Sequence, residues 1–354
     1  MKKLFIFLIG LGMSFTSLSQ PCLPNGIIFN AQSQIDNFPT NYPNCTGIEG
    51  NVIINGSNIK NLYGINAITT IGGQLVIFRN DSLTNLAGLE NLESVGGQLE
   101  ILLNSGLNSL TGLLRLTSIG GNLVIDSNNV LPNLTGMDSL SSAGGNIQIN
   151  SNISLTSVNG LRSLVSTGGD IGIWGNPILS DLGDFENLTS IGGELYFSNN
   201  NALATLHGLD SIKAESIHSL HIFNNPNLST CAIKSICDFL SIPYMLIEIH
   251  DNAPGCNSEG RIDTICNALS VDYKRISELF SIYPNPVSTN LNIESTEKYP
   301  ESSLSILDLQ GNEIIKCPIS DKNTLINLNK LSSGMYFLKI TSLNTVHNFK
   351  LIKH

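Results

Sequence analysis

The chain repeats one pattern of apolar and polar positions every 24 residues. Each copy follows the scheme G-G-x-L-x-I-x-x-N-x-x-L-x-x-L-x-G-L-x-x-L-x-S, with substitutions. A divergent copy occupies residues 48–70, and about two more follow, from Ile217 and from Tyr244. Six copies in register indicate a repeat architecture. Their Gly-Gly pairs lie at 72–73, 96–97, 120–121, 144–145, 168–169 and 192–193.

Each L-x-I segment predicts a short β-strand, because alternate side chains of a strand point to opposite faces. One such strand per copy, stacked at about 4.8 Å, builds a parallel sheet along one side of a coil. Burying a Leu or Ile contributes roughly 1.5–3 kcal/mol before entropy is subtracted, so single copies are unstable and need their neighbours. We therefore expect a mostly β fold: a right-handed, leucine-rich, β-helix-like solenoid of 24-residue coils.

Two further columns of the repeat are not apolar. A buried asparagine at a fixed turn can bond backbone groups of the adjacent coil that would otherwise lack a partner. The Gly-Gly pair predicts a tight corner that needs either a positive φ or a close backbone approach. The asparagine column contains Asn80, Asn104, Asn128, Asn152, Asn176 and Asn200.

An open solenoid exposes its core at both ends, so it needs caps. The cysteines lie where such caps would be, and an exported chain should pair most of them. We expect Cys22 to bond Cys45 within an N-terminal cap over residues 20–47. Zinc is the rival interpretation, but no cysteine spacing resembles C-x₂-C. Four more cysteines accompany a helix-like segment at 232–240 and allow three connectivities: Cys231, Cys237, Cys256 and Cys266.

The first residues predict a secretory signal over residues 1–19. Lys2 and Lys3 precede an apolar run at 4–13, and Ser17 and Ser19 suit a cleavage site before Gln20. No later segment is long and apolar enough to span a bilayer. The net charge of −10 disfavours nucleic-acid binding, which needs a basic face. A hydrophobic share of 41% argues against a disordered acidic chain.

The paired cysteines, the segment GIEGNVII at 47–54 and units such as LENLESVGG at 89–97 resemble the receptor L domain. This leucine-rich, β-helix-like module occurs in growth-factor receptor ectodomains and in many bacterial surface proteins. The resemblance covers about residues 22–266, of which 48–266 form the solenoid and its C-terminal cap. It departs from the receptors in having more uniform repeats and no furin-like cysteine-rich region. Since the module binds protein ligands through its sheet face in receptors, the resemblance implies a binding scaffold for an unknown extracellular protein or glycan.

After a polar linker at 267–279, the period gives way to short alternating strands at 280–354, which predict a small β-sandwich. The segments FSIYPNP at 280–286, LSSGMYFLK at 331–339 and KLIK at 350–353 resemble the type A sorting domain of type IX secretion. Its motif here is Tyr283, Pro284, Asn285 and Pro286. The resemblance implies handling by the type IX machinery and translocation across the outer membrane of a Bacteroidota-type bacterium. Removal of the domain, with Cys317, then leaves the protein released or attached to surface lipopolysaccharide. An ordinary sandwich domain with a binding role is the alternative.

Acidic residues on the outward columns raise the question of catalysis. Asp170 and Glu194 are expected to stack about 5 Å apart on neighbouring strands, and a polysaccharide-active β-helix enzyme needs such carboxylates. No Lys or Arg stands nearby to complete a site, so we expect solvated surface acids. The chain shows no nucleophile–base signature, phosphate loop or zinc spacing. We therefore expect no enzyme, no cofactor and no metal.

Aromatic residues on the outward columns are the best candidates for a ligand site. Trp174, Tyr196, His221 and Phe223 are expected to lie together near the C-terminal end of the sheet. Such rings can stack on sugars or anchor a protein partner, although scatter or contact with the C-terminal cap would also explain them. The sequence thus favours a secreted or surface protein for binding or adhesion. An inert spacer and a polysaccharide-active enzyme are the alternatives.

Overall fold

A computed structural model describes residues 21–268, 280–295, 302–308, 311–319, 322–342 and 345–354. The chain divides into two compact units, with the boundary between Ile265 and Cys266. The expected signal segment and residues 269–279 of the expected linker lie outside the described residues. Residues 267–268 belong to a helix whose described part is 259–268.

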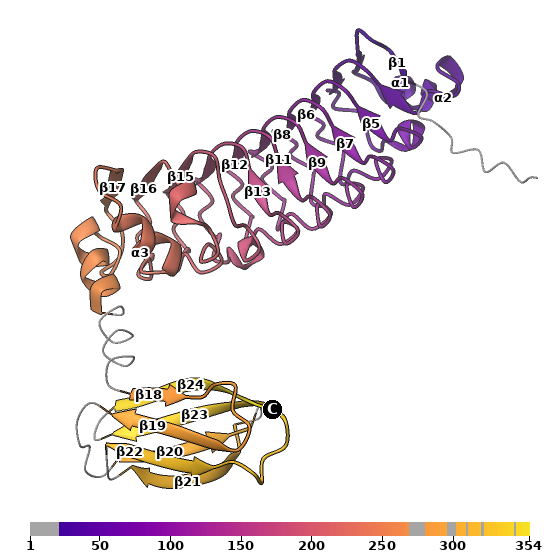
Figure 1. Ribbon diagram of the computed structural model, residues 1–354. Coiled ribbons are helices and arrows are strands. Elements are labelled where there is room, and N and C mark those ends of the chain that lie inside the picture. Colours follow the sequence, from indigo (N-terminus) through magenta and orange to yellow (C-terminus); the bar gives the residue numbers. More distant parts are fainter. Residues whose placement is uncertain (1–20, 269–279, 296–301, 309–310, 320–321, 343–344) are drawn as a thin grey trace, which may run out of the picture. The chain divides into compact units, whose positions relative to one another are not determined.

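The first unit is built on a ten-stranded parallel sheet that runs along its length (Figure 1). Equivalent residues of successive copies are paired across it, as Leu99 with Leu123 and Leu123 with Ile147. The fold is therefore mostly β, as the sequence predicted, while the right-handedness of the coil stays a prediction. The strands are β2 (Ile27–Phe29), β4 (Val52–Ile54), β6 (Leu75–Phe78), β8 (Leu99–Leu102), β10 (Leu123–Asp126), β12 (Ile147–Asn150), β14 (Ile171–Trp174), β15 (Glu194–Ser198), β16 (Ser219–Phe223) and β17 (Leu246–His250).

A second parallel sheet, which the sequence did not predict, contains seven strands of two residues each. In most copies these are the serine or threonine that closes a repeat and the residue after it. Two-residue strands show no alternating pattern, so the sequence carries no sign of them. The strands are β1 (Pro21–Cys22), β3 (Gly47–Ile48), β5 (Thr70–Ile71), β7 (Ser94–Val95), β9 (Ser118–Ile119), β11 (Ser142–Ala143) and β13 (Ser166–Thr167).

The Gly-Gly pair turns the chain from the short strand into the long one. A Cβ on Gly96 would lie 2.3 Å from the carbonyl oxygen of Gly72, and one on Gly120 would lie 2.1 Å from that of Gly96. Neither Gly96 nor Gly120 has a positive φ. Close contact between coils is therefore the reason for these glycines, and the positive φ falls at another column, for example +125° at Gly112.

The inward columns form one long core. Leu75, Leu99 and their counterparts in the next four copies are completely buried, as are Ile77 and Ile101. Between the strands the coils are mostly turns, with short 3₁₀ segments. These are η1 (Tyr63–Ile65), η2 (Gly183–Phe185) and η3 (Ala214–Ser216).

The asparagine column forms a hydrogen-bonded ladder through this core. The backbone N–H of Asn104 donates to Oδ1 of Asn128 at 3.2 Å, and Nδ2 of Asn104 donates to the carbonyl oxygen of Ile77 at 2.9 Å. The ladder continues beyond the six predicted positions through Asn225 to Asn252. It satisfies backbone groups that close packing hides from water. Asn80, Asn104, Asn128, Asn152, Asn176 and Asn200 are all completely buried.

Both ends of the solenoid carry helices and disulfides. At the N-terminal end, α1 (Gln32–Asp36) and α2 (Phe38–Asn41) bury Ile35 and Phe38. The predicted Cys22–Cys45 disulfide is present there, with a Cα–Cα distance of 5.7 Å. The C-terminal end has α3 (Lys234–Leu240) and the helix at 259–268. Of the connectivities left open there, the structure selects one that joins Cys231 to Cys256; Cys237 and Cys266 are also disulfide-bonded.

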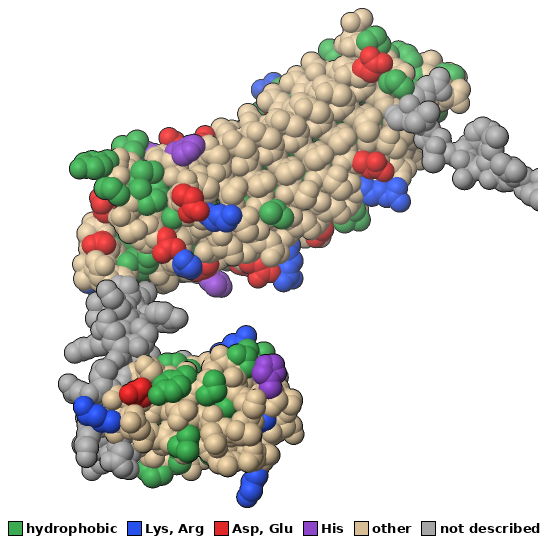
Figure 2. All heavy atoms as spheres, viewed as in Figure 1, with side chains coloured by type: hydrophobic (Ala, Val, Ile, Leu, Met, Phe, Trp, Pro, Cys, Tyr) green, Lys and Arg blue, Asp and Glu red, His purple; other side chains and the backbone are tan. Residues whose placement is uncertain are grey.

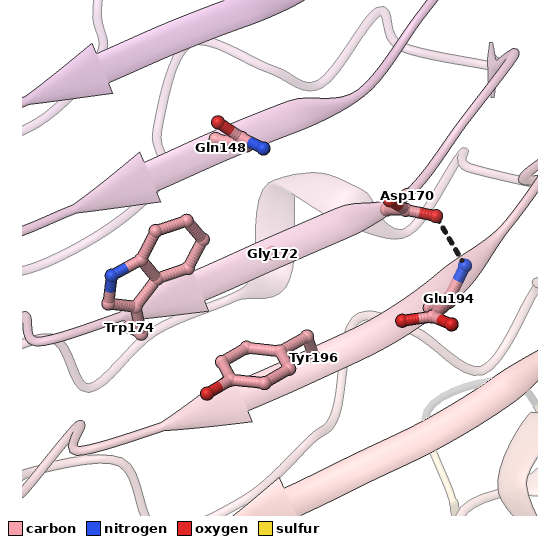
Figure 3. Close-up of a pocket in the computed structure, with 6 residues that line it drawn as sticks. All are labelled: Gln148, Asp170, Gly172, Trp174, Glu194 and Tyr196. Atoms are coloured by element: carbon pink, nitrogen blue, oxygen red, sulfur yellow. Dashed lines mark hydrogen bonds between the residues drawn. The ribbon is translucent and has the colours of Figure 1, made fainter. Parts of the chain in front are cut away.

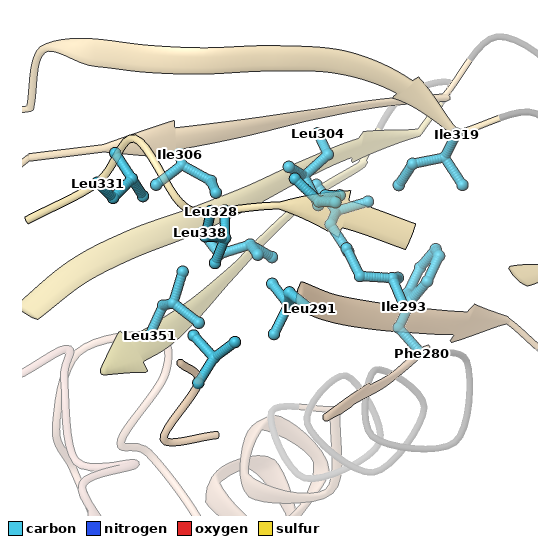
Figure 4. Packing of buried hydrophobic residues seen from close by; sticks show 13 residues of the cluster. Phe280, Leu291, Ile293, Leu304, Ile306, Ile319, Leu328, Leu331, Leu338 and Leu351 are labelled. Atoms are coloured by element: carbon cyan, nitrogen blue, oxygen red, sulfur yellow. The ribbon is translucent and has the colours of Figure 1, made fainter. Parts of the chain in front are cut away.

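The second unit consists of two antiparallel sheets that share one core (Figure 4). Leu291 of one sheet and Leu304 and Leu338 of the other are completely buried in it, which makes the unit the expected β-sandwich. Cys317 is a free, partly buried thiol, and burial raises its pKa. One sheet contains β18 (Phe280–Tyr283), β19 (Asn290–Ser295) and β22 (Asn323–Asn327); the other contains β21 (Glu313–Ile319), β20 (Ser302–Leu307), β23 (Gly334–Ser342) and β24 (Thr345–Lys353).

The Y-P-N-P motif joins the start of this unit to its last strand. Nδ2 of Asn285 donates to the carbonyl oxygen of Lys350 at 2.7 Å, and Oδ1 of Asn285 accepts from the backbone N–H of Ile352 at 2.9 Å. The motif thus has a structural role in holding β24. Among the described residues of both units, no helix is long and apolar enough to cross a membrane.

Candidate functional site

The four predicted aromatic residues come together on the outward face of the ten-stranded sheet. The register aligns Tyr196 with His221, and it aligns Ser198, two residues after Tyr196, with Phe223. Tyr196 is the centre of the group: its ring centroid lies 5.8 Å from that of Trp174, 6.0 Å from that of His221 and 5.4 Å from that of Phe223. All four side chains are partly exposed.

The sequence analysis missed a fifth member of this group, His250 of β17. Its ring stacks on that of Phe223 with a centroid distance of 5.1 Å and an interplanar angle of 10°. His250 is aligned with Phe223, so extending that column by one coil would have found it. Ile222 pairs with Ile249 across 27 residues rather than 24, so the copy that carries His250 is three residues longer.

Beside the aromatic group lies a shallow hollow of about 260 Å³ (Figure 3). Its centre is Gly172, which presents only backbone where the neighbouring strands carry Gln148 and Tyr196. A Cβ on Gly172 would lie 2.8 Å from Cζ3 of Trp174, so only a glycine here leaves room for the indole ring in this position. The lining residues are Gln148, Asp170, Gly172, Trp174, Glu194 and Tyr196.

Asp170 is not the solvated surface acid that the sequence led us to expect. Its Oδ1 accepts from the backbone N–H of Glu194 at 2.8 Å, and its Oδ2 accepts from Nδ2 of Asn146 at 3.0 Å. The second glycine of the next copy makes room for it, because a Cβ on Gly193 would lie 2.0 Å from Oδ1 of Asp170. Asp170 therefore links three coils, whereas the side chain of Glu194 is 47% exposed.

Acids and histidines alternate across the last strands. His221 Nδ1 lies 2.9 Å from Oε2 of Glu248, and His221 Nε2 lies 3.8 Å from Oε2 of Glu194. His250 contacts Oε1 of Glu248 through Nε2 at 3.3 Å and Oδ2 of Asp251 through Nδ1 at 2.7 Å. The hydrogen bonds with His221 and then His250 lower the pKa of Glu248, while those with Asp251 and then Glu248 raise the pKa of His250.

This alternation forms a row and not a cluster. In the part of the chain that the structure describes, no three His, Cys, Asp or Glu side chains are arranged to hold a metal ion. The arrangement offers aromatic faces and carboxylate oxygens to a ligand from outside.

Comparison with known proteins finds two family models that match separate parts of the chain. Residues 44–111 match the receptor L domain, and residues 281–354 match the secretion system C-terminal sorting domain. No curated protein matches the sequence. The receptor L match covers the N-terminal part of the solenoid and not the strands β14 to β17 that carry the candidate site. The sorting-domain match implies contact with the type IX machinery and export to the cell surface or the medium of a Bacteroidota-like bacterium. Both resemblances predicted from the sequence are thereby confirmed: a stretch similar to the receptor L domain precedes one similar to the type IX sorting domain.

Proposed function

We propose that this chain is a non-enzymatic binding or adhesion protein of the cell surface or the medium. It presents the outward face of its ten-stranded sheet to an extracellular protein or glycan. The observation that carries the proposal is the row of partly exposed rings around Tyr196, next to the hollow at Gly172. Aromatic rings supply large contact areas with few rotatable bonds, which is why they dominate binding surfaces.

The contacts of Asp170 favour binding over catalysis. Hydrolysis of a glycosidic bond uses two carboxyl groups that can donate or accept a proton or attack the sugar. Both carboxylate oxygens of Asp170 already accept hydrogen bonds from neighbouring coils, which suits a structural role. An inert spacer, in turn, gives no reason for five aromatic and imidazole rings to gather on one exposed face.

The test uses the full chain on glycan and protein arrays and on whole cells. Replacing Trp174 and Tyr196 together by Ala should weaken binding to the ligand so found by about tenfold or more, as for other central aromatic contacts. Tyr63→Ala is the matched control, because Tyr63 is 61% exposed on η1, outside the sheet. The proposal fails if no array yields a ligand, or if the double variant binds as well as the control.

A further inference from the structure

The charge of the sheet face restricts what can bind there. None of the ten strands contains Lys or Arg, whereas they contain Glu100, Asp126, Glu194 and Glu248. Hydrophobic side chains gather at the end of the solenoid that carries β16 and β17 (Figure 2). A partner of this face therefore has to match negative charge as well as apolar surface.

The hollow combines these two properties on the scale of one side chain. The rings of Trp174 and Tyr196 stand at 84° to each other and form a corner at one end. Asp170 and Glu194 lie at the other end, with the bare backbone of Gly172 between them (Figure 3). A volume of about 260 Å³ suits a single side chain or one sugar ring.

The two carboxylates of the hollow suit a ligand that donates hydrogen bonds and carries positive charge, while Gln148 and the hydroxyl of Tyr196 can both donate and accept. The carboxylates of Asp170 and Glu194 only accept hydrogen bonds when ionised, and Lys and Arg only donate them. Aromatic faces attract a cation through the negative face of the ring. A neutral sugar both donates and accepts, so it would leave the negative charge at this end uncompensated.

Glu194 is the group that is free to pair with a cation. The carboxylate oxygens of Asp170 are already bound by Glu194 N–H and by Asn146. The only ionic contact of Glu194 in the described residues is the 3.8 Å approach of His221, whose other ring nitrogen is held by Glu248. Among the described residues, no Lys or Arg forms an ion pair with Glu194.

We propose that this hollow binds a Lys or Arg side chain of a partner protein, between the rings of Trp174 and Tyr196 and the carboxylate of Glu194. The inference rests on the proposed binding function and names the chemical class of its ligand. Charge complementarity with the acidic sheet face selects a basic segment of the partner.

The chain carries its own reporter, because Trp174 is its one tryptophan. We would titrate the full chain with hexalysine and hexaarginine peptides at pH 7.5 and low salt, and follow tryptophan fluorescence. A saturable change that salt weakens is expected, with none for hexaglutamate. Glu194→Gln should weaken binding about threefold to tenfold, which is the range for an exposed ion pair next to aromatic rings.

Glu100→Gln is the matched control: it removes the same charge from β8 of the same sheet, away from the hollow. Tyr196→Leu is a second test that leaves the charge unchanged and should also weaken binding. The inference is overturned if the basic peptides give no saturable change, or if Glu194→Gln and Glu100→Gln weaken binding equally. It is also overturned if xylohexaose or chitohexaose binds instead, regardless of Glu194→Gln. If an oligosaccharide binds in this way, the proposed binding function stands. If no probe binds and no array yields a ligand, both the proposed function and this inference are contradicted.

Discussion

At the scale of single residues, buried asparagines hold the coils together. Nδ2 of Asn152 donates to the carbonyl oxygens of Ile125 and Asn150, both at 2.9 Å, and its Oδ1 accepts from the backbone N–H of Asn128 at 3.0 Å. Asn152→Leu would remove these three hydrogen bonds. The carbonyl oxygen of Asn150 still accepts from the backbone N–H of Ser127, whereas the other two buried groups lose this partner at about 1–3 kcal/mol each. We expect the free energy of unfolding, measured by urea denaturation, to fall by at least about 2 kcal/mol.

An exposed asparagine in the preceding coil serves as the control for that measurement. Asn129 follows the ladder residue Asn128 and is exposed to solvent. Asn129→Leu should change the free energy of unfolding by no more than about 0.5 kcal/mol, as is usual for surface substitutions. Equal effects of the two leucine variants would show that the ladder does not stabilise the solenoid.

The titration of His250 is a second test at this scale. Hydrogen bonds to Asp251 and Glu248 raise the pKa of His250 above the ordinary 6.5. The stability that these contacts add to the folded state is therefore complete below pH 6.5 and is lost as the pH rises through the raised pKa. The pKa of Glu248 is lowered from 4.5, so its contribution is present above that value and is lost as the pH falls through the lowered pKa. Glu248 and His250 therefore carry opposite charges between pH 4.5 and 6.5.

Proton NMR of the imidazole measures this directly. Asp251→Asn removes the largest cause of the raised pKa and should bring the pKa of His250 back toward 6.5. Asp238→Asn is the control, because Asp238 pairs with Lys234 on α3 instead. A titration of His250 that Asp251→Asn does not move would contradict the role given to that contact.

At the scale of elements, the sequence predicted the features that lie within one copy of the repeat and missed the contacts between two copies. The L-x-I strands and the inward columns follow from side-chain alternation, which each copy carries in its own residues. The close approach of Gly96 to Gly72, by contrast, exists only between coils. Local reasoning left a positive φ and a close approach both open, and only the stacked structure decides between them.

The candidate site shows the same division. Extending the columns brought Trp174 and Tyr196 together, because six copies keep a constant spacing. His250 was missed because its column was followed only as far as Phe223. The role of Asp170 was also missed: the repeat places Asn146 and Glu194 beside it but does not show that both its carboxylate oxygens accept hydrogen bonds from them. Hydrogen bonds between coils decide the role of such a side chain, and an aligned sequence does not show them.

At the scale of the whole molecule, the proposed binding surface and the sorting domain belong to separate units. The solenoid and the C-terminal sandwich each have a closed hydrophobic core, so we expect each to fold with its own transition. Asn285 lies in the sorting motif and holds β24 through Lys350 and Ile352, so the motif and the stability of the sandwich are physically linked.

Asn285→Ala in the full chain should therefore affect one unit and not the other. Loss of two hydrogen bonds, about 0.5–1.5 kcal/mol each, should lower the unfolding temperature of the sandwich by several degrees in calorimetry. The transition of the solenoid should stay in place, and less protein should reach the surface or the medium in cell fractionation. Asn329→Ala, at an exposed residue of the same unit, should leave both readouts unchanged. If Asn285→Ala blocks export while the sandwich melts as before, the secretion machinery reads this side chain directly, and its hold on β24 is not what export requires.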